Sequence, residues 1–228
     1  MRPIGIFGGT FDPVHFGHLR PVQEVMRALV LEEVRFIPAA IPPHRCAPAA
    51  APEDRLRMLE LALSGIPGLR VDDRELRRGG PSFTVPTLES LRAELGPRPL
   101  CLIIGMDAFG SIGTWHRASE LPQLAHLVVV QRPGWNHSRD VALGLPWLRG
   151  RLCTAPSELA GTPAGRLMFR VVTPQDLSAS RIRAMIGLGE SVHGMLPEPV
   201  EEYISRRGLY LSQPRGCDAS RHDSTDNL

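Results

Sequence analysis

Two histidines, His15 and His18, are the residues near the start of the 228-residue chain whose types and spacing could do chemistry. They lie three residues apart in the stretch "GGTFDPVHFGH", directly after a short apolar run. Close to a polyphosphate, both imidazoles could be protonated and donate to the same anion. Gly8 and Gly9 permit positive φ and let backbone N–H groups approach an anion without a Cβ in the way.

The position of this stretch favours a ligand site over a plain chain reversal. It follows a predicted strand, Ile4–Phe7, and enters a predicted helix that begins near His18. A helix N-terminus offers N–H groups and a positive dipole end, which suit phosphate. A turn with two surface histidines is the alternative, and the complete motif disfavours it. Zinc would need a third ligand, and none is evident nearby.

The full stretch resembles the signature of the nucleotidyltransferase superfamily with the (H/T)xGH motif. The resemblance implies an α/β enzyme that transfers a nucleoside monophosphate from a triphosphate to an acceptor. The motif does not identify the acceptor, because the superfamily includes pyridine-nucleotide adenylyltransferases, phosphopantetheine adenylyltransferase and several cytidylyltransferases. Carried over residue by residue, the resemblance predicts ATP contacts at Gly8, Gly9, Thr10, Phe11, His15 and His18.

A second motif, "DLSASRIRAMI", begins at Asp176. Ser178 and Ser180 are suitable helix N-caps, and Arg183 lies one turn into the predicted helix, where it can reach a phosphate. In isolation this is an ordinary capped helix. Behind the histidine loop it resembles the superfamily's ISSTxIR motif, which implies that Ser178, Ser180 and Arg183 bind ATP phosphates. Ala179 replaces the middle serine, so that side-chain contact is lost.

A third segment runs from Ile103 in "IIGMDAFGSIGTWHRASEL". Gly105 ends a predicted strand, and the Asp107 carboxylate that follows can accept ribose hydroxyls or face a metal. Trp115 could stack on an aromatic ring or anchor the rim of the core. The segment resembles the GxD…W region of bacterial nicotinate mononucleotide adenylyltransferases, which implies that Trp115, followed by His116, contacts the pyridine ring.

Three further segments agree with that family. "PPHR" resembles its PPHK-like loop, "QRPG" its RPG element and "PSFTVPTLESL" its SYTxxTL segment. They imply mononucleotide contacts at His44, Arg45, Phe83, Thr84, Thr87 and Arg132. A solvated surface charge remains an alternative for Arg132. Because Phe83 replaces the usual tyrosine and Pro86 a common acidic residue, the preference for nicotinate over nicotinamide is left open.

The combined resemblance implies transfer of AMP from ATP to nicotinate mononucleotide, with His18, His15 and Arg183 as catalytic residues. Mg²⁺ is expected to accompany ATP, held mainly by phosphate oxygens and water, and no protein metal site is predicted. The same chemistry on nicotinamide mononucleotide or phosphopantetheine stays open, as does an inactive adenine-nucleotide-binding regulator.

Apolar runs of strand length alternate with helical patterns along the chain. This rhythm predicts an α/β fold with a doubly wound, mostly parallel sheet and a C-terminal helical part. We expect one domain over residues 1–211, with a rim excursion at 134–165 and helices within 176–208. The polar stretch 212–228 is expected to be disordered.

The composition of the chain argues against several kinds of partner and site. The net charge of +2 is too small to indicate nucleic-acid binding, and all 26 basic residues are arginine. Four scattered cysteines indicate neither a disulfide framework nor a zinc site and fit a reducing cytoplasm. No segment approaches the length of a membrane span. We therefore expect a cytoplasmic enzyme without nucleic-acid or membrane partners, and a homo-oligomer is left open.

Overall fold

The computed structural model describes residues 1–42, 47–131 and 144–211. Within these ranges, six strands form one sheet in the order β3-β2-β1-β4-β5-β6, and every neighbouring pair is parallel. The strands are β1 (Ile4–Gly9), β2 (Glu33–Pro38), β3 (Leu69–Val71), β4 (Leu100–Gly105), β5 (His126–Gln131) and β6 (Leu167–Val171). This is a doubly wound order that reverses between β1 and β4, so the predicted α/β fold is confirmed.

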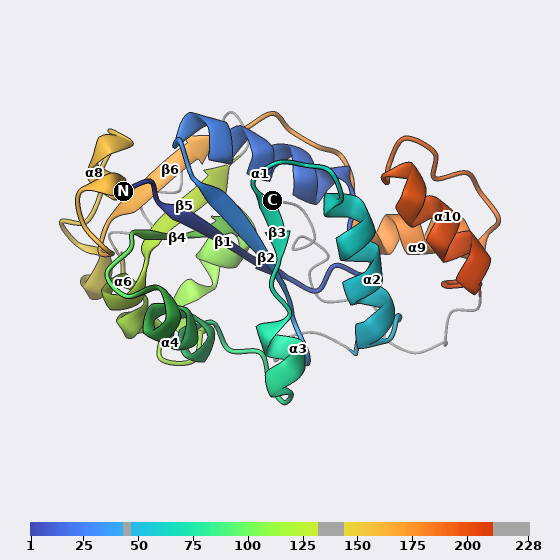
Figure 1. Ribbon diagram of the computed structural model, residues 1–228, viewed down its shortest axis with the longest axis horizontal. Coiled ribbons are helices and arrows are strands. Elements are labelled where there is room, and N and C mark those ends of the chain that lie inside the picture. The colour runs from blue at the N-terminus through green and yellow to red at the C-terminus, as the bar shows by residue number, and fades with distance from the viewer. Residues whose placement is uncertain (43–46, 132–143, 212–228) are drawn as a thin grey trace.

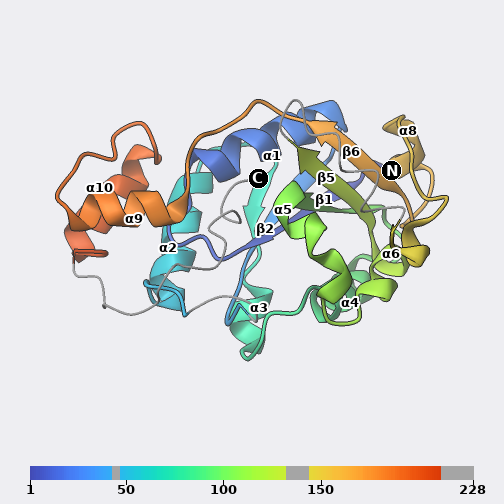
Figure 2. The same ribbon diagram turned by 180° about the vertical axis from the view of Figure 1, so that it is seen from behind.

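Helices cover both faces of the sheet and extend it at one end. They are α1 (Phe16–Ala28), α2 (Pro52–Leu63), α3 (Arg74–Arg78), α4 (Thr84–Leu95), α5 (Met106–Gly110), α6 (Leu121–Leu124), α8 (Ser157–Ala160), α9 (Ala179–Gly187) and α10 (Glu198–Arg207). Figures 1 and 2 place α9 and α10 beside α2 at one end of the molecule, and α8 at the other. The C-terminal helical part is therefore as predicted.

The central strands are buried on both faces, which explains their unbroken apolar runs. In β4, Leu100 and Leu102 pack in the core formed with α4, α5 and α6, whereas Cys101 and Ile103 pack in the core formed with α1 and α2. A central parallel strand has no solvated face, so polar alternation would bury unpaired groups. β1 and β4 pair in parallel from Ile4 with Leu100 to Ile6 with Leu102, so their carboxyl ends point to the same edge of the sheet, where such sheets bind ligands.

The start of α1 differs from the sequence-based expectation. β1 extends two residues beyond the predicted end at Phe7 and includes Gly8 and Gly9; the positive φ in this loop is at Phe11, with φ 52°. The helix begins at Phe16 rather than near His18. Extending the strand carries the chain further before it turns, so the turn falls on the "FDP" residues.

Several other expectations are not tested by the structure. The described part of the rim excursion contains the short helix α8 and a 3-10 turn at Pro146–Leu148. The single-domain division, a homo-oligomer and the cytoplasmic location stay predictions, and the predicted disordered stretch 212–228 lies outside the described residues. None of the helices in the described ranges has both the length and the apolar character needed to cross a bilayer.

Candidate active site

The structure brings His15 and His18 into contact at the N-terminus of α1. His15 is the N-cap residue and is fully buried. Its backbone N–H donates to Nδ1 of His18 at 3.3 Å, and the two ring centroids lie 3.8 Å apart. Both imidazoles therefore sit where the helix presents its N–H groups and positive dipole end, an arrangement suited to an anion.

The glycines of the motif are required by the aromatic rings around them. A Cβ on Gly17 would lie 2.7 Å from Nδ1 of His15, and a Cβ on Gly9 would lie 2.9 Å from the Phe11 ring. Phe11 is buried in the core, and its ring meets the His18 ring edge-on at 5.2 Å. Phe11 thus supports His18 from the core side, and its predicted contact with ATP stays a prediction.

The second motif meets the first although they are far apart in sequence. Arg183, on α9, donates from Nη1 to the Asp12 carbonyl oxygen at 2.6 Å, across 171 residues. Ser178 caps α9 by accepting from the Arg181 backbone N–H at 3.3 Å. Ser180 lies inside the first turn of α9, so the expectation that it is an N-cap is wrong.

Asp12, in the Asp-Pro pair of the histidine loop, joins this loop to distant segments. Its buried carboxylate accepts from the backbone N–H groups of Ala49 at 2.7 Å and Ala50 at 3.1 Å, and from the Tyr210 hydroxyl at 2.8 Å. Asp12 thereby fastens the histidine loop to the segment before α2 and to the C-terminal end of the described chain. An Asp-Pro turn alone gives no signal for these distant partners.

Arg55, on α2, supports the same loop through hydrogen bonds to backbone carbonyl groups. It is fully buried and donates to the carbonyl oxygens of Thr10 at 2.8 Å and Ala39 at 2.7 Å. Burial lowers the pKa of its guanidinium, and the charge of Asp12 acts in the opposite direction. Arginine keeps its proton in proteins, so a permanent cation lies beneath the candidate phosphate site. The sequence analysis missed this residue, because arginine is common on helices.

At the carboxyl end of β4, Gly105 is the N-cap of α5 and Asp107 lies in its first turn, partly exposed. This is the strand beside β1, so Asp107 follows the predicted ligand edge. Trp115 is partly buried and packs against the core on the α4 side. That contact agrees with the rim-anchor interpretation of Trp115, and its stacking on a pyridine ring stays a prediction.

Two of the residues predicted to contact the mononucleotide lie against each other. The rings of Phe83 and His116 have centroids 4.5 Å apart and are inclined by 31°. Phe83 is the N-cap of α4, so Thr84 is the first residue of that helix. The structure therefore joins the α4 N-terminus to the segment that carries Trp115.

Thr87 is buried within this side of the site. Its hydroxyl donates to Glu75 at 2.5 Å and accepts from Arg78 at 3.1 Å. These bonds tie α3, a helix that the sequence analysis did not predict, to the first turn of α4. Thr87 therefore supports the loop in this structure, and its predicted contact with the mononucleotide stays a prediction. His44, Arg45 and Arg132 lie outside the described residues.

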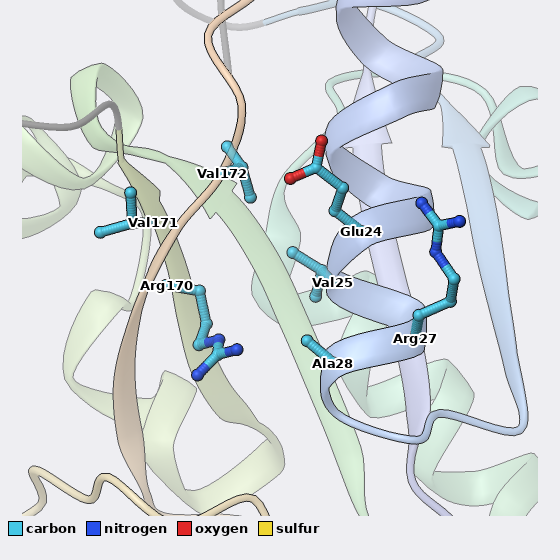
Figure 3. Close-up of a pocket in the computed structure, with 7 residues that line it drawn as sticks. All are labelled: Glu24, Val25, Arg27, Ala28, Arg170, Val171 and Val172. Carbon is cyan, nitrogen blue, oxygen red and sulfur yellow. The ribbon is translucent and has the colours of Figure 1, made fainter.

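A separate hollow lies between α1 and β6 (Figure 3). It is lined by Glu24, Val25, Arg27, Ala28, Arg170, Val171 and Val172. None of the predicted site residues that the structure describes lines it. The candidate site is therefore assigned to the carboxyl ends of β1 and β4, where the predicted residues gather.

Comparison with known proteins identifies the family. A model of cytidylyltransferase-like proteins matches residues 6–185. A probable nicotinate-nucleotide adenylyltransferase of Halorhodospira halophila is 48% identical over 210 residues, covering 92% of this chain and 96% of the relative. That of Methylococcus capsulatus is also 48% identical, covering 91% and 99%. The chain belongs to the nicotinate-nucleotide adenylyltransferase family. The family resemblance inferred from the motifs is thus confirmed.

Solved structures agree with the fold. The nicotinic acid mononucleotide adenylyltransferase of Plasmodium falciparum, complexed with NaAD, superposes with a TM-score of 0.71 at 13% identity, covering 93% of this chain and 99% of that one. A putative nicotinate-nucleotide adenylyltransferase of Vibrio parahaemolyticus gives a TM-score of 0.63 at 16% identity, covering 93% and 98%. Members of this nucleotidyltransferase family thus share the doubly wound sheet.

Proposed function

We propose that the site transfers the AMP moiety of ATP to nicotinate mononucleotide, giving nicotinate adenine dinucleotide and pyrophosphate in NAD biosynthesis. The observation that carries this proposal is the contact between Arg183 and Asp12, which joins the second motif to the loop bearing both histidines. Membership of the family at 48% identity supports the choice of reaction.

The reaction needs positioning and charge neutralisation more than proton transfer. An oxygen of the mononucleotide phosphate attacks the α-phosphorus of ATP, and the bond from that phosphorus to the oxygen bridging the α- and β-phosphates breaks in line. The electron pair leaves with pyrophosphate. Because the attacking phosphate is already an anion at neutral pH, no general base is required. Catalysis then comes from orientation and from donors placed where negative charge develops.

We assign these donors to the histidine loop and α9. His18, His15 and Arg183 neutralise charge on the α-phosphoryl group and the leaving pyrophosphate, with His18 acting on the transition state. The end of β1, where Gly8 is exposed and Gly9 partly exposed, is proposed to approach the phosphates, and Asp107 accepts from the ribose hydroxyls. The remaining ATP contacts are assigned to Gly8, Gly9, Thr10, Phe11, Gly105, Ser178 and Ser180.

Mg²⁺ is proposed to enter with ATP. Among the residues that the structure describes, no group of three or more His, Cys, Asp and Glu side chains is arranged to hold a metal ion. A triphosphate-bound Mg²⁺ fits such a site because it keeps several waters and needs only one or two protein carboxylates. Phosphate oxygens and water are proposed to provide most of its ligands. The ion would neutralise phosphate charge.

The acceptor is assigned to the opposite side of the site. Trp115 stacks on the pyridine ring, and Phe83, His116 and Thr84 surround it. Arg132, Arg45 and His44 are proposed to bind the phosphate of the mononucleotide. Nicotinate is preferred over nicotinamide in this proposal, on the strength of the family to which the chain belongs.

One assay tests the proposal. The protein is incubated with ATP and Mg²⁺, and pyrophosphate is measured with nicotinate mononucleotide, nicotinamide mononucleotide and phosphopantetheine in turn. We expect the highest kcat/KM with nicotinate mononucleotide. Faster turnover of nicotinamide mononucleotide would change the assigned acceptor, and the absence of pyrophosphate with all three would overturn the enzymatic assignment.

A further inference from the structure

Tyr210 joins the C-terminal end of the described chain to the histidine loop. Its hydroxyl donates to Oδ1 of Asp12 at 2.8 Å, across 198 residues of sequence. The side chain is buried, and burial, followed by the charge of Asp12, raises the pKa of the Tyr210 hydroxyl. The hydroxyl therefore keeps its proton at physiological pH and remains a donor.

The backbone is strained on both sides of this hydrogen bond. Tyr210 has φ 67°, and Phe11, which directly precedes Asp12, has φ 52°. Non-glycine residues rarely adopt this left-handed conformation, and aromatic residues there persist only where surrounding contacts enforce it. One strained residue, Tyr210, makes this hydrogen bond, and the other, Phe11, directly precedes Asp12 and contacts the His18 ring, which places the strain at the candidate site.

The geometry of Asp12 suggests what the contact does. Arg183 donates to the Asp12 carbonyl oxygen at 2.6 Å, while its Nη1 lies 3.9 Å from the carboxylate oxygen Oδ2. The carboxylate is instead satisfied by Tyr210 and by the N–H groups of Ala49 and Ala50. These three donors hold the carboxylate at 3.9 Å from Arg183, as a loose ion pair. A closer, hydrogen-bonded pair would occupy guanidinium donors that a phosphate needs.

We propose that Tyr210 is a positioning residue for adenylyl transfer: by holding the Asp12 carboxylate, it keeps Arg183 oriented toward the triphosphate. This inference rests on the proposed function, because it assigns Arg183 to ATP. Without the hydroxyl, Oδ1 of Asp12 keeps, among the described residues, the Ala50 N–H as its donor. The attraction between the carboxylate and Arg183 then closes the 3.9 Å gap.

The chain offers a matched control. Tyr203, on α10, donates its hydroxyl to Oδ1 of Asp54 on α2 at 2.7 Å. The bond has the same chemistry as that of Tyr210 and also fastens the C-terminal part to the domain, but its acceptor lies outside the histidine loop. Tyr210→Phe and Tyr203→Phe therefore remove the same group from two places.

The two variants are compared by kcat, by the KM for each substrate and by thermal unfolding. We expect Tyr210→Phe to lower kcat/KM for ATP about tenfold, the usual effect of losing a hydrogen bond to a charged group, with the KM for the mononucleotide nearly unchanged. Tyr203→Phe should keep wild-type kinetics at a similar loss of thermal stability. Equal kinetic losses in both variants would overturn the proposal, since they would indicate a general structural effect.

A measurement on the wild-type sequence does not depend on how the variants fold. The chain has two tyrosines, so labelling with 3-fluorotyrosine gives two ¹⁹F resonances, which the Tyr203→Phe variant assigns. Adding a non-hydrolysable ATP analogue should shift the Tyr210 resonance and leave that of Tyr203 in place. An unmoved Tyr210 resonance at saturating analogue would overturn the proposal. The analogue needs no acceptor, so this result is independent of whether nicotinate mononucleotide is the substrate.

Discussion

The side of the site assigned to ATP is fastened by buried polar contacts between distant segments, whereas the side assigned to the mononucleotide is framed by helix ends and aromatic rings. On the first side, Asp12 and Arg55 bind backbone groups from three loops. On the second, Phe83 and His116 stack at the surface and Trp115 packs against the rim of the core.

From this difference we infer that the ATP side of the site promotes the chemical step and the other side selects the acceptor. Buried polar groups held by several hydrogen bonds are costly to rearrange, so they hold donors in one geometry, as charge stabilisation in a transition state requires. Aromatic contacts at helix ends tolerate substitution and can be altered without disturbing the phosphates. We therefore expect changes on the ATP side to act mainly on kcat and changes on the other side to act on the KM for the mononucleotide.

The largest effect is expected for His18→Ala. Because His18 is the donor assigned to the transition state, its removal should lower kcat by about 10²–10³-fold, the range seen when one preorganised donor is lost. The KM values should change far less, and the cooperative thermal unfolding should persist because α1 keeps its buried face. Steady-state kinetics measure this. His193→Ala, which removes an exposed imidazole far along the chain, is the control. Near-wild-type turnover of His18→Ala would contradict the catalytic assignment.

A somewhat smaller loss is expected for Gly17→Ala. The new Cβ would lie 2.7 Å from Nδ1 of His15, so the ring must move. Displacement of a catalytic group by about 1 Å can cost up to 10²-fold, and we expect kcat to fall about ten- to a hundredfold. Stability should not fall in parallel, since alanine favours a helix over glycine by about 1 kcal/mol.

Gly161→Ala is the matched control for this substitution. Gly161 has φ −82°, and a Cβ there would make only ordinary contacts, with the nearest atom at 3.7 Å. Kinetics and thermal unfolding are measured on both variants. If Gly17→Ala kept full activity, the close packing of His15 against α1 would have no catalytic consequence.

The features that depend on neighbouring residues in the sequence could be predicted from the sequence. The apolar runs gave the parallel sheet because a strand buried on both faces leaves no polar alternation, as β4 shows. The histidine loop was predictable because a glycine pair, a turn and a helix start follow each other in sequence. Its partners were not, because Tyr210 and Arg55 reach Asp12 and Thr10 only through tertiary packing.

The errors have the same origin. The first strand was expected to end at Phe7, yet it runs to Gly9 and the bend falls on Phe11, which its core contacts hold in place. Ser180 was taken as a cap from residue type alone, whereas the helix starts one residue after Ser178. Helix α3 was missed because five residues give no periodicity to read.

On the mononucleotide side, Trp115→Ala should raise the KM for the mononucleotide about tenfold, since stacking on a base contributes about 1–3 kcal/mol. The KM for ATP should stay close to that of the wild type. Trp147→Ala is the control, because Trp147 is also partly buried and packs against the same core cluster. Kinetics with both substrates varied distinguish the outcomes. An equal effect of the two variants, or a rise in the KM for ATP alone, would contradict the stacking role of Trp115 and leave it as an anchor at the rim of the core.

The smallest effect is expected for Thr87→Val, which keeps the side-chain shape but removes the hydroxyl. Its bonds to Glu75 and Arg78 would be lost, leaving the buried Glu75 carboxylate short of a donor. We expect the free energy of unfolding to fall by about 1–3 kcal/mol. The KM for the mononucleotide should rise about threefold, because the first turn of α4 carries Phe83 and Thr84 into the site.

Thr162→Val is the control for this last variant, since the exposed Thr162 hydroxyl bonds only a backbone oxygen two residues away. Denaturant unfolding and kinetics with the mononucleotide varied are measured on both. Because the Thr87 hydroxyl bonds Glu75, Arg78 and the Phe83 carbonyl oxygen, the substitution should act on the N-terminal end of α4 and leave kcat nearly unchanged. A fall in kcat as large as that of Gly17→Ala would mean that the two sides of the site are mechanically joined through α4, and the division between reaction and selection would be lost.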